Sequence, residues 1–191
     1  MASSLKVGIV GYGFATKTFH APLIAAVPGL SLTAISSSDP AKVRADWPDL
    51  AVETSPEALF ARADLDLVVI PTPNTTHAPL ANAALAAGKH VVVDKPFTVT
   101  LAEAQALDAF AKQQGRMLSV FHNRRWDADF LTLRKVLKTG ELGEIRHFES
   151  HFDRYRPEVR SRWREQALPG SGLWYDLGAH LLDQVLQLFG L

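Results

Sequence analysis

The chain has 191 residues, of which 47% are hydrophobic and 21% are charged. This composition excludes wholesale disorder and suits one globular domain, or one domain with part of a second. The 20 Lys and Arg residues balance the 20 Asp and Glu residues, so we expect no nucleic-acid partner. Cysteine is absent, which excludes disulfides and zinc–thiolate sites. No apolar run approaches the ~20 residues that span a bilayer, and no signal-peptide core follows residue 1, so we expect a cytoplasmic protein with no membrane partner.

Short apolar runs alternate with helix signals over the first 121 residues. The runs predict buried strands at 5–10, 30–35, 67–70, 90–93 and 117–121. Helices are predicted to begin where a capping side chain precedes a proline or forms a capping box, at Asp39, Ser55 and Thr100. This alternation predicts an α/β fold, a Rossmann-type doubly wound parallel sheet, over 1–121.

The pattern changes after residue 121. Helices are predicted at 127–139, closed by Gly140, and at 173–189, and a strand with weak alternation is predicted at 145–155. We therefore place a domain boundary near 121–127. Residues 122–191 are expected to form the start of a second α+β domain with an open sheet.

A glycine loop follows the first predicted strand, with Gly11 and Gly13 one residue apart. Gly11 permits a tight turn, and Gly13 lets a pyrophosphate approach the backbone. The helix that follows offers free N–H groups to the phosphates. Thr16 occupies the third glycine position, so a tight turn without a ligand is the alternative for this loop alone. Its place in a βαβ unit favours dinucleotide binding by Gly11, Gly13, Phe14, Ala15 and Thr16.

The end of the second predicted strand indicates which dinucleotide binds. An NAD site usually has a carboxylate there for the ribose 2′-hydroxyl. Here the strand ends in the hydroxyls of Ser36, Ser37 and Ser38, and Asp39 is expected to be occupied as a helix cap. Hydroxyls without a free acid suit a 2′-phosphate, and Lys42 could help to bind it. We therefore favour NADP, with NAD as the alternative.

Two other predicted strand ends carry polar residues toward the same edge of the sheet, where ligands of doubly wound folds bind. One holds Thr72, Pro73, Asn74 and His77, and the other holds Asp94, Lys95 and Pro96. A proline-stiffened turn and an ordinary surface lysine are the alternatives. His20 is predicted to pack early in its helix or to face the crevice. No histidine–carboxylate set has metal-ligand spacing, so no metal is expected.

These motifs together resemble the glucose–fructose oxidoreductase / inositol dehydrogenase / MocA family of NAD(P)-dependent oxidoreductases. The resemblance runs from GIVGYG through PTPNTTH, AGKHVVVDKP and FHNRRWD to GLWYDLGAHLLD. The last segment resembles the family signature Gly-x-x-x-Asp-x-x-x-His, here Gly172, Asp176 and His180. HNRRW and RYRPEVRSRWRE look most like the NADP-dependent scyllo-inositol dehydrogenase type. The usual Glu before Lys95-Pro96 is Asp94 here.

The resemblance implies roles for particular residues. Lys95, Asp176 and His180 are expected to be catalytic, since the carboxylate and the imidazole lie four residues apart on one helix face and Lys95 can stabilise a developing oxyanion. An exposed helical pair is the alternative for Asp176 and His180. Trp163 and Arg164 are expected to help bind the cofactor, and Lys95 and His180 to bind substrate together with His122, Asn123, Arg124 and Tyr155.

The arginine-dense segment of residues 154–164 has three interpretations. Its arginines are Arg154, Arg156, Arg160, Arg162 and Arg164. Interleaved Tyr155 and Trp163 suit nucleic-acid stacking, but the balanced charge disfavours it. A loop over cofactor and polyol is favoured, and a salt-bridged surface is the remaining interpretation.

The expected function is hydride transfer between NADP and a hydroxyl or carbonyl of a sugar or polyol. The alternatives are an NAD-dependent glycoside hydrolase of the same family and a dinucleotide sensor without turnover. In the family, an open, mostly antiparallel sheet follows, much of it beyond residue 191, and it packs in dimers. The chain is therefore expected to be the N-terminal portion of a homo-oligomeric protein. Alone, it is expected to bind NADP, to turn over poorly, and either to self-associate or to pack its terminal helix onto the Rossmann domain.

Overall fold

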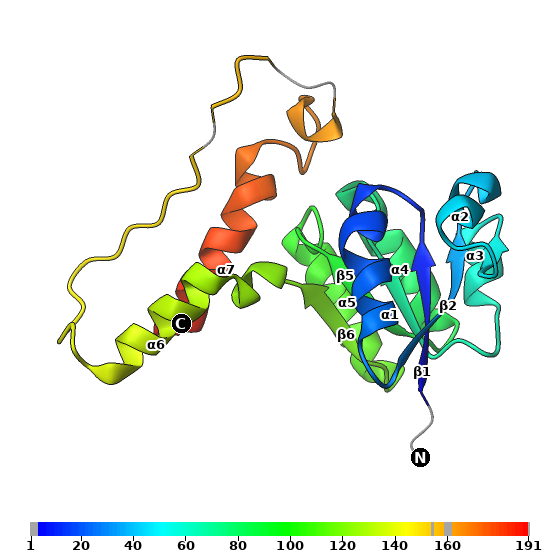
Figure 1. The fold of residues 1–191 in the computed structure, drawn as a ribbon, viewed down its shortest axis with the longest axis horizontal. Helices are drawn as coiled ribbons and strands as arrows, with labels where there is room; N and C mark the ends of the chain where they lie inside the picture. Colours follow the sequence, from blue (N-terminus) through cyan, green and yellow to red (C-terminus); the bar gives the residue numbers. More distant parts are fainter. Residues whose placement is uncertain (1–3, 154, 159–161, 191) are drawn as a thin grey trace. The chain divides into compact units, whose positions relative to one another are not determined.

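The computed structural model describes residues 4–153, 155–158 and 162–190 (Figure 1). The chain divides after Phe121 into two compact units, residues 1–121 and 122–191. The first unit is built on a sheet, whereas the described part of the second unit is built on helices.

A sheet of six parallel strands forms the first unit, in the order β3-β2-β1-β4-β5-β6. The strands are β1 (Leu5–Val10), β2 (Leu30–Ser36), β3 (Ala51–Glu53), β4 (Leu67–Ile70), β5 (His90–Asp94) and β6 (Leu118–Phe121). The Rossmann-type sheet predicted from the sequence is confirmed. β3 escapes the sequence pattern because three residues are too few to show a period, and it forms by pairing with the end of β2.

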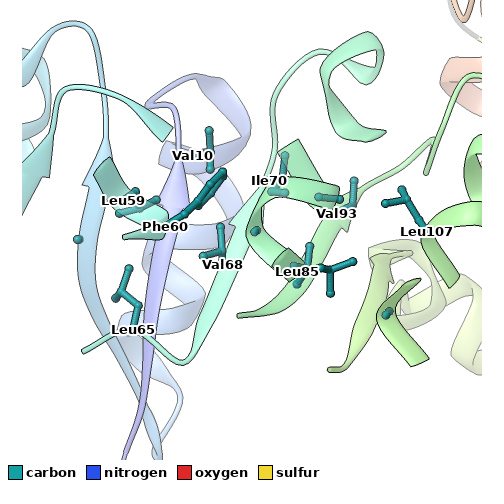
Figure 2. Close-up of a cluster of buried hydrophobic side chains, with 14 residues drawn as sticks. Val10, Leu59, Phe60, Leu65, Val68, Ile70, Leu85, Val93 and Leu107 are labelled. Carbon is teal, nitrogen blue, oxygen red and sulfur yellow. The ribbon is translucent and has the colours of Figure 1, made fainter. Parts of the chain in front are cut away.

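Helices cover both faces of this sheet (Figure 1). α1 (Ala21–Ala26) and α2 (Pro40–Asp46) pack on one face, and α3 (Pro56–Phe60), α4 (His77–Ala86) and α5 (Leu101–Gln113) pack on the other. Side chains of a strand point to alternate faces, so Val68 and Ile70 of β4 join the cluster with Leu85 and Leu107 (Figure 2), and Leu67 lies in the opposite cluster. Burial on both faces explains why β4 and the second half of β1 are continuous apolar runs.

The predicted helix starts are confirmed by their capping hydrogen bonds. The Asp39 carboxylate accepts a hydrogen bond from the backbone N–H of Lys42 at 3.1 Å, and the Ser55 hydroxyl accepts one from Ala58 at 3.2 Å. Thr100 forms the capping box at the start of α5. Each cap satisfies N–H groups that the first turn of a helix leaves without partners.

Helices make up the regular structure in the described part of the second unit. They are α6 (Ala128–Thr139), which Gly140 ends at φ +74°, α7 (Ala179–Phe189), and the short helical turns η3 (Asn123–Trp126), η4 (Trp163–Glu165) and η5 (Trp174–Gly178). η5 runs directly into α7, so the helix predicted at 173–189 is present. In the described part of the chain, no helix combines the length and apolar character that a membrane crossing requires.

The strand predicted at 145–155 is wrong for the residues that the structure describes there, 145–153 and 155, which form no regular element. An alternating pattern indicates which side chains could share a face, but a strand forms only when a second strand accepts its hydrogen bonds. No such strand is present in the described residues of the second unit, so residues 145–153 have no partner strand among them.

Candidate dinucleotide-binding and catalytic site

The glycine loop connects β1 to the helix that contains α1. Gly11 has φ +82°, in the left-handed region that favours glycine, and its N–H donates to the carbonyl oxygen of Ser36 at 2.8 Å. Helical backbone begins at Phe14, directly after Gly13, and continues through the short segment η1 (Thr16–His20) into α1. The buried Thr16 hydroxyl donates to the Gly11 carbonyl oxygen at 2.9 Å. Thr16 therefore holds the loop at the position where the full fingerprint has its third glycine.

The loop fits a dinucleotide on the geometry of its two glycines. A Cβ on Gly13 would meet no atom within 4 Å, and a Cβ on Gly11 would meet only Thr72 Cγ2 at 3.7 Å. The backbone is therefore open for the close approach of a pyrophosphate, and a helix begins beside it. The sheet order reverses between β1 and β4, and ligands of doubly wound folds bind outside the strand ends at this point. Gly11, Gly13 and the first helical turn would hold the pyrophosphate.

The serine turn, residues 36–38, lies at the end of the neighbouring strand β2. Ser36 is buried, and Ser38 is exposed. The Ser37 hydroxyl bonds the backbone of Asp39, accepting from its N–H at 3.1 Å. Asp39 is engaged as the cap of α2, as predicted. Ser38 and the exposed Lys42 therefore stand as the groups available for a ribose phosphate.

Sequence reasoning missed a second carboxylate beside this turn. Glu53 ends β3 and lies in register with Ser36. Its Oε1 accepts a hydrogen bond from Nη1 of Arg62 at 2.9 Å, and Asp64 and Glu53 together raise the pKa of Arg62, mainly through hydrogen bonds. The Glu53 carboxylate is thus engaged by an arginine rather than presented alone. Only recognition of β3 could have placed Glu53 at this edge.

His77 ties together the loops that follow β4 and β5. Its Nδ1 lies 2.9 Å from the carbonyl oxygen of Pro96, and its Nε2 lies 2.8 Å from that of Thr72. The ring is buried, as is Asn74 in the short helical turn η2 (Asn74–Thr76). His77 therefore supports the segments that carry Thr72, Pro73 and Lys95. Direct contact of His77 with a cofactor stays a prediction.

Lys95 follows the last residue of β5 and is half-buried. The preceding Asp94 places its Oδ1 2.7 Å from Nε2 of His20. The His20 side chain is 4% exposed, and its ring contacts the Phe121 ring at a centroid distance of 4.5 Å. His20 thus lies inside the fold and links the helix after the glycine loop to the strand end that carries Lys95. The catalytic role of Lys95 stays a prediction.

Asp176 and His180 lie on consecutive turns of the η5–α7 helix in the second unit. A Cβ on Gly178 would meet the Trp174 indole at 2.7 Å, so the glycine between the two residues allows this ring to pack against the backbone. His180 is buried. Asp176 Oδ1 lies 3.2 Å from Nε of Arg164. The expected catalytic and cofactor residues of this segment, Asp176 and Arg164, are therefore brought together.

Hydrogen bonds and ion pairs connect the segment of the predicted substrate residues 122–124 to α7. The α7 residues that form them, Asp183 and Gln184, were not predicted from the sequence. Asp183 accepts hydrogen bonds from two of the guanidinium nitrogens of Arg125, Nε and Nη2, with Oδ2 2.7 Å from Nε. His122 Nδ1 lies 3.9 Å from the same carboxylate, and Gln184 donates to the carbonyl oxygen of Arg124 at 3.1 Å. His180 and Gln184 are buried and four residues apart, so polar residues at helical spacing could have indicated this face.

Carboxylates pair with three described arginines of the 154–164 segment, namely Arg156, Arg162 and Arg164. Arg162 and Arg156 both pair with Glu165, and Arg162, through its hydrogen bond, holds the pKa of Glu165 below its usual range. These pairs favour the salt-bridged interpretation. Tyr155 is 91% exposed. Arg154, Arg160 and the Trp163 side chain lie outside the described residues.

A cavity of about 560 Å³ lies within the second unit. Its lining includes Phe152, Arg156, Arg164, Glu165, Asp176 and Leu177. The mixture of guanidinium and carboxylate groups offers both donors and acceptors, which suits a ligand rich in hydroxyl groups.

Comparison with known proteins identifies the protein family. A sequence model described as "Oxidoreductase family, NAD-binding Rossmann fold" matches residues 5–122, and one described as "GFO/IDH/MocA C-terminal domain" matches residues 130–191. The chain belongs to the Gfo/Idh/MocA oxidoreductase family and carries its NAD(P)-binding Rossmann domain. The resemblance inferred from the motifs is confirmed.

Individual relatives match along the whole chain. It is 66% identical to "Uncharacterized oxidoreductase YdgJ" of Escherichia coli, covering 100% of this chain and 55% of the relative. It is 42% identical to scyllo-inositol 2-dehydrogenase (NADP(+)) IolW of Bacillus subtilis, covering 98% and 52%. The solved structure of YPO2259 from Yersinia pestis superimposes with a TM-score of 0.94 at 65% identity, covering 100% and 54%. The chain thus spans about half the length of these relatives.

Proposed function

We propose that this chain contributes the cofactor site and the acid–base residues of an NADP-dependent dehydrogenase. Its reaction is hydride transfer between the nicotinamide and a hydroxyl or carbonyl carbon of a sugar or polyol. The observation that carries the proposal is the open glycine loop at the sheet's switch point, with Lys95 on a strand end of the same sheet. The similarity to an NADP-dependent inositol dehydrogenase supports the substrate class.

The cofactor preference rests on the serine turn. Asp39 is committed to capping α2, and Glu53 is paired with Arg62, so neither carboxylate stands alone at the ribose. A 2′-phosphate would meet the exposed Ser38 and Lys42 without repulsion from a free acid. These contacts support NADP over NAD.

When bound, the nicotinamide supplies the hydride acceptor or donor. The chain must then hold the substrate oxygen and move its proton. His180 is proposed to take the hydroxyl proton during oxidation and to return it during reduction. Lys95 is proposed to place its ammonium beside a substrate oxygen on which negative charge develops. Asp176 would favour the protonated imidazole, and Nε of Arg164 lies 3.2 Å from Oδ1 of that carboxylate.

A steady-state assay tests this function. Inositols and aldoses are screened for absorbance growth at 340 nm with NADP and NAD in parallel, on this chain and on a longer form. In a form that turns over, Lys95→Ala and His180→Ala are expected to lower kcat by roughly 10²–10⁴, while His180→Ala changes cofactor affinity much less. Near-normal kcat in His180→Ala contradicts the assignment.

Two other outcomes of the same assay point to other functions. Cleavage of a glycoside without net absorbance change at 340 nm indicates a hydrolase that uses bound cofactor transiently. Tight NADP binding by a longer form, without turnover of any sugar or polyol, indicates a dinucleotide sensor.

A further inference from the structure

Tyr12, the residue between the two glycines of the loop, has a buried side chain that reaches the far end of a neighbouring helix. It is 6% exposed and belongs to the apolar cluster under α1 and α2. Its hydroxyl donates to Oδ2 of Asp46, the last residue of α2, at 2.7 Å. Nζ of Lys17 lies 2.6 Å from the same oxygen and 4.9 Å from the centre of the Tyr12 ring. We call Tyr12, Asp46 and Lys17 the loop clamp.

The protonation states of Tyr12 and Asp46 favour the hydrogen bond between them. Burial, followed by the hydrogen bond to Asp46, raises the pKa of Tyr12 to about 12, so its hydroxyl keeps the proton that it donates. Lys17 and then Tyr12 hold the pKa of Asp46 below its usual range. A carboxylate that accepts from both a hydroxyl and an ammonium forms charge-assisted hydrogen bonds, which are stronger than neutral ones.

The glycine loop needs such an anchor because its two glycines form no side-chain contacts that could hold the loop in place. Gly11 and Gly13 have no side chains, and open space surrounds the position of a Gly13 Cβ. The Thr16 hydroxyl fixes the carbonyl of Gly11. Tyr12 therefore provides the side-chain anchor between the two glycines, on the side of the loop that faces α2.

The clamp also connects two parts of the proposed cofactor site. The serine turn is followed by Asp39, which caps α2, and α2 begins at Pro40. The Ser37 hydroxyl bonds the backbone of Asp39. α2 ends at Asp46, which holds Tyr12. One short helix thus links the turn proposed to hold the ribose phosphate with the loop proposed to hold the pyrophosphate.

We propose that Tyr12 and Asp46 are positioning residues for dinucleotide binding, which hold the glycine loop in the arrangement that accepts a pyrophosphate and fix it to the helix of the serine turn. The inference rests on the proposed function, because it assigns these residues to the same cofactor site. Tyr12 and Asp46 act through the backbone of the loop and need not touch the cofactor.

The test uses substitutions that keep shape and remove one interaction. Tyr12→Phe keeps the packed ring and removes the hydroxyl, and Asp46→Asn removes the charge at a half-exposed site. Asp108→Asn is the matched control, because Asp108 forms a similar exposed pair with Lys112 at 2.7 Å on α5. Calorimetric titration of the 191-residue chain with NADPH and with NADH gives the dissociation constants, and thermal unfolding without ligand gives stability.

Tyr12→Phe and Asp46→Asn are each expected to raise the dissociation constants of NADPH and NADH about tenfold, by the same factor for both because the pyrophosphate is common to them. The double variant should show less than the sum of the two single effects, since one change removes and the other weakens the same Tyr12–Asp46 contact. Asp108→Asn should bind as the wild type. Variants that lose only thermal stability and bind both dinucleotides normally overturn the inference and leave the proposed function standing. A wild-type chain that binds neither dinucleotide overturns both.

Discussion

Substitution of Gly13 by alanine is expected to have opposite effects on folding stability and on dinucleotide binding. The added Cβ would meet no atom within 4 Å, and Gly13 does not have a positive φ. Alanine at such a position restricts the unfolded chain and stabilises a protein by about 0.4–1 kcal/mol. The same methyl group would occupy the space through which a pyrophosphate approaches. Forcing an extra methyl group into a filled contact costs about 1–3 kcal/mol, which weakens binding roughly fivefold to 150-fold.

Gly29→Ala is the matched control. Gly29 has φ +91°, again with no atom within 4 Å of a Cβ, and it precedes β2 at the edge of the sheet opposite the glycine loop. Alanine there should lower the free energy of unfolding by about 1–2 kcal/mol through backbone strain alone and leave NADPH affinity unchanged. Urea unfolding and calorimetric titration measure both quantities for both variants. Wild-type NADPH affinity in Gly13→Ala would refute the role given to this loop.

Three further predictions concern single contacts. Ser37→Asp should shift preference from NADPH toward NADH by about tenfold in calorimetric titration, because a carboxylate repels the 2′-phosphate; an unchanged ratio contradicts the position of the ribose site. The pKa of Tyr12 is raised to about 12 in the folded chain, so the stabilisation linked to its proton is complete below pH 10 and is lost as the pH rises toward about 12. Tyr12→Phe should therefore show a flatter dependence of melting temperature on pH over that range. Equal slopes in the two proteins would show that the hydroxyl is not bound to Asp46. Asp183→Asn should lower the free energy of unfolding of the second unit by about 2 kcal/mol, because it breaks the two-point contact with Arg125, with no change in NADPH affinity; thermal unfolding and the same titration check it.

The sequence predicts local structure well where the cause is local. The caps at Asp39, Ser55 and Thr100 act within three residues, and their hydrogen bonds are present. The apolar runs predict β1 and β4 at the centre of the sheet, because β4 and the second half of β1 are buried on both faces. The strand predicted at 145–155 fails for the opposite reason. Strand formation depends on a partner strand, and a pattern within one segment says nothing about a partner.

The site shows the same division between local and distant causes. The tight turn at Gly11 is predicted from a glycine placed directly after a strand, because a tight turn is a local property. The bond from Tyr12 to Asp46 joins residues 34 positions apart, and the pair of His20 with Asp94 joins residues 74 apart. Such contacts have no signature in the spacing of residue types, and they emerge only when the topology brings the two elements together.

The supporting contacts around the expected catalytic residues follow from packing rather than from motif. Asp183 and Gln184 fasten residues 122–125 onto α7, and His77 joins two strand-end loops. The sequence could not predict these contacts, because the partner of each residue is a distant side chain or a backbone carbonyl.

The most direct test of the account is a calorimetric titration of the unmodified chain with NADPH and, separately, with NADH. An open glycine loop beside a serine turn without a free acid predicts one site per chain and tighter binding of NADPH. A chain that binds neither dinucleotide, or that prefers NADH by tenfold, about 1.4 kcal/mol, would contradict the site described for the glycine loop and the serine turn.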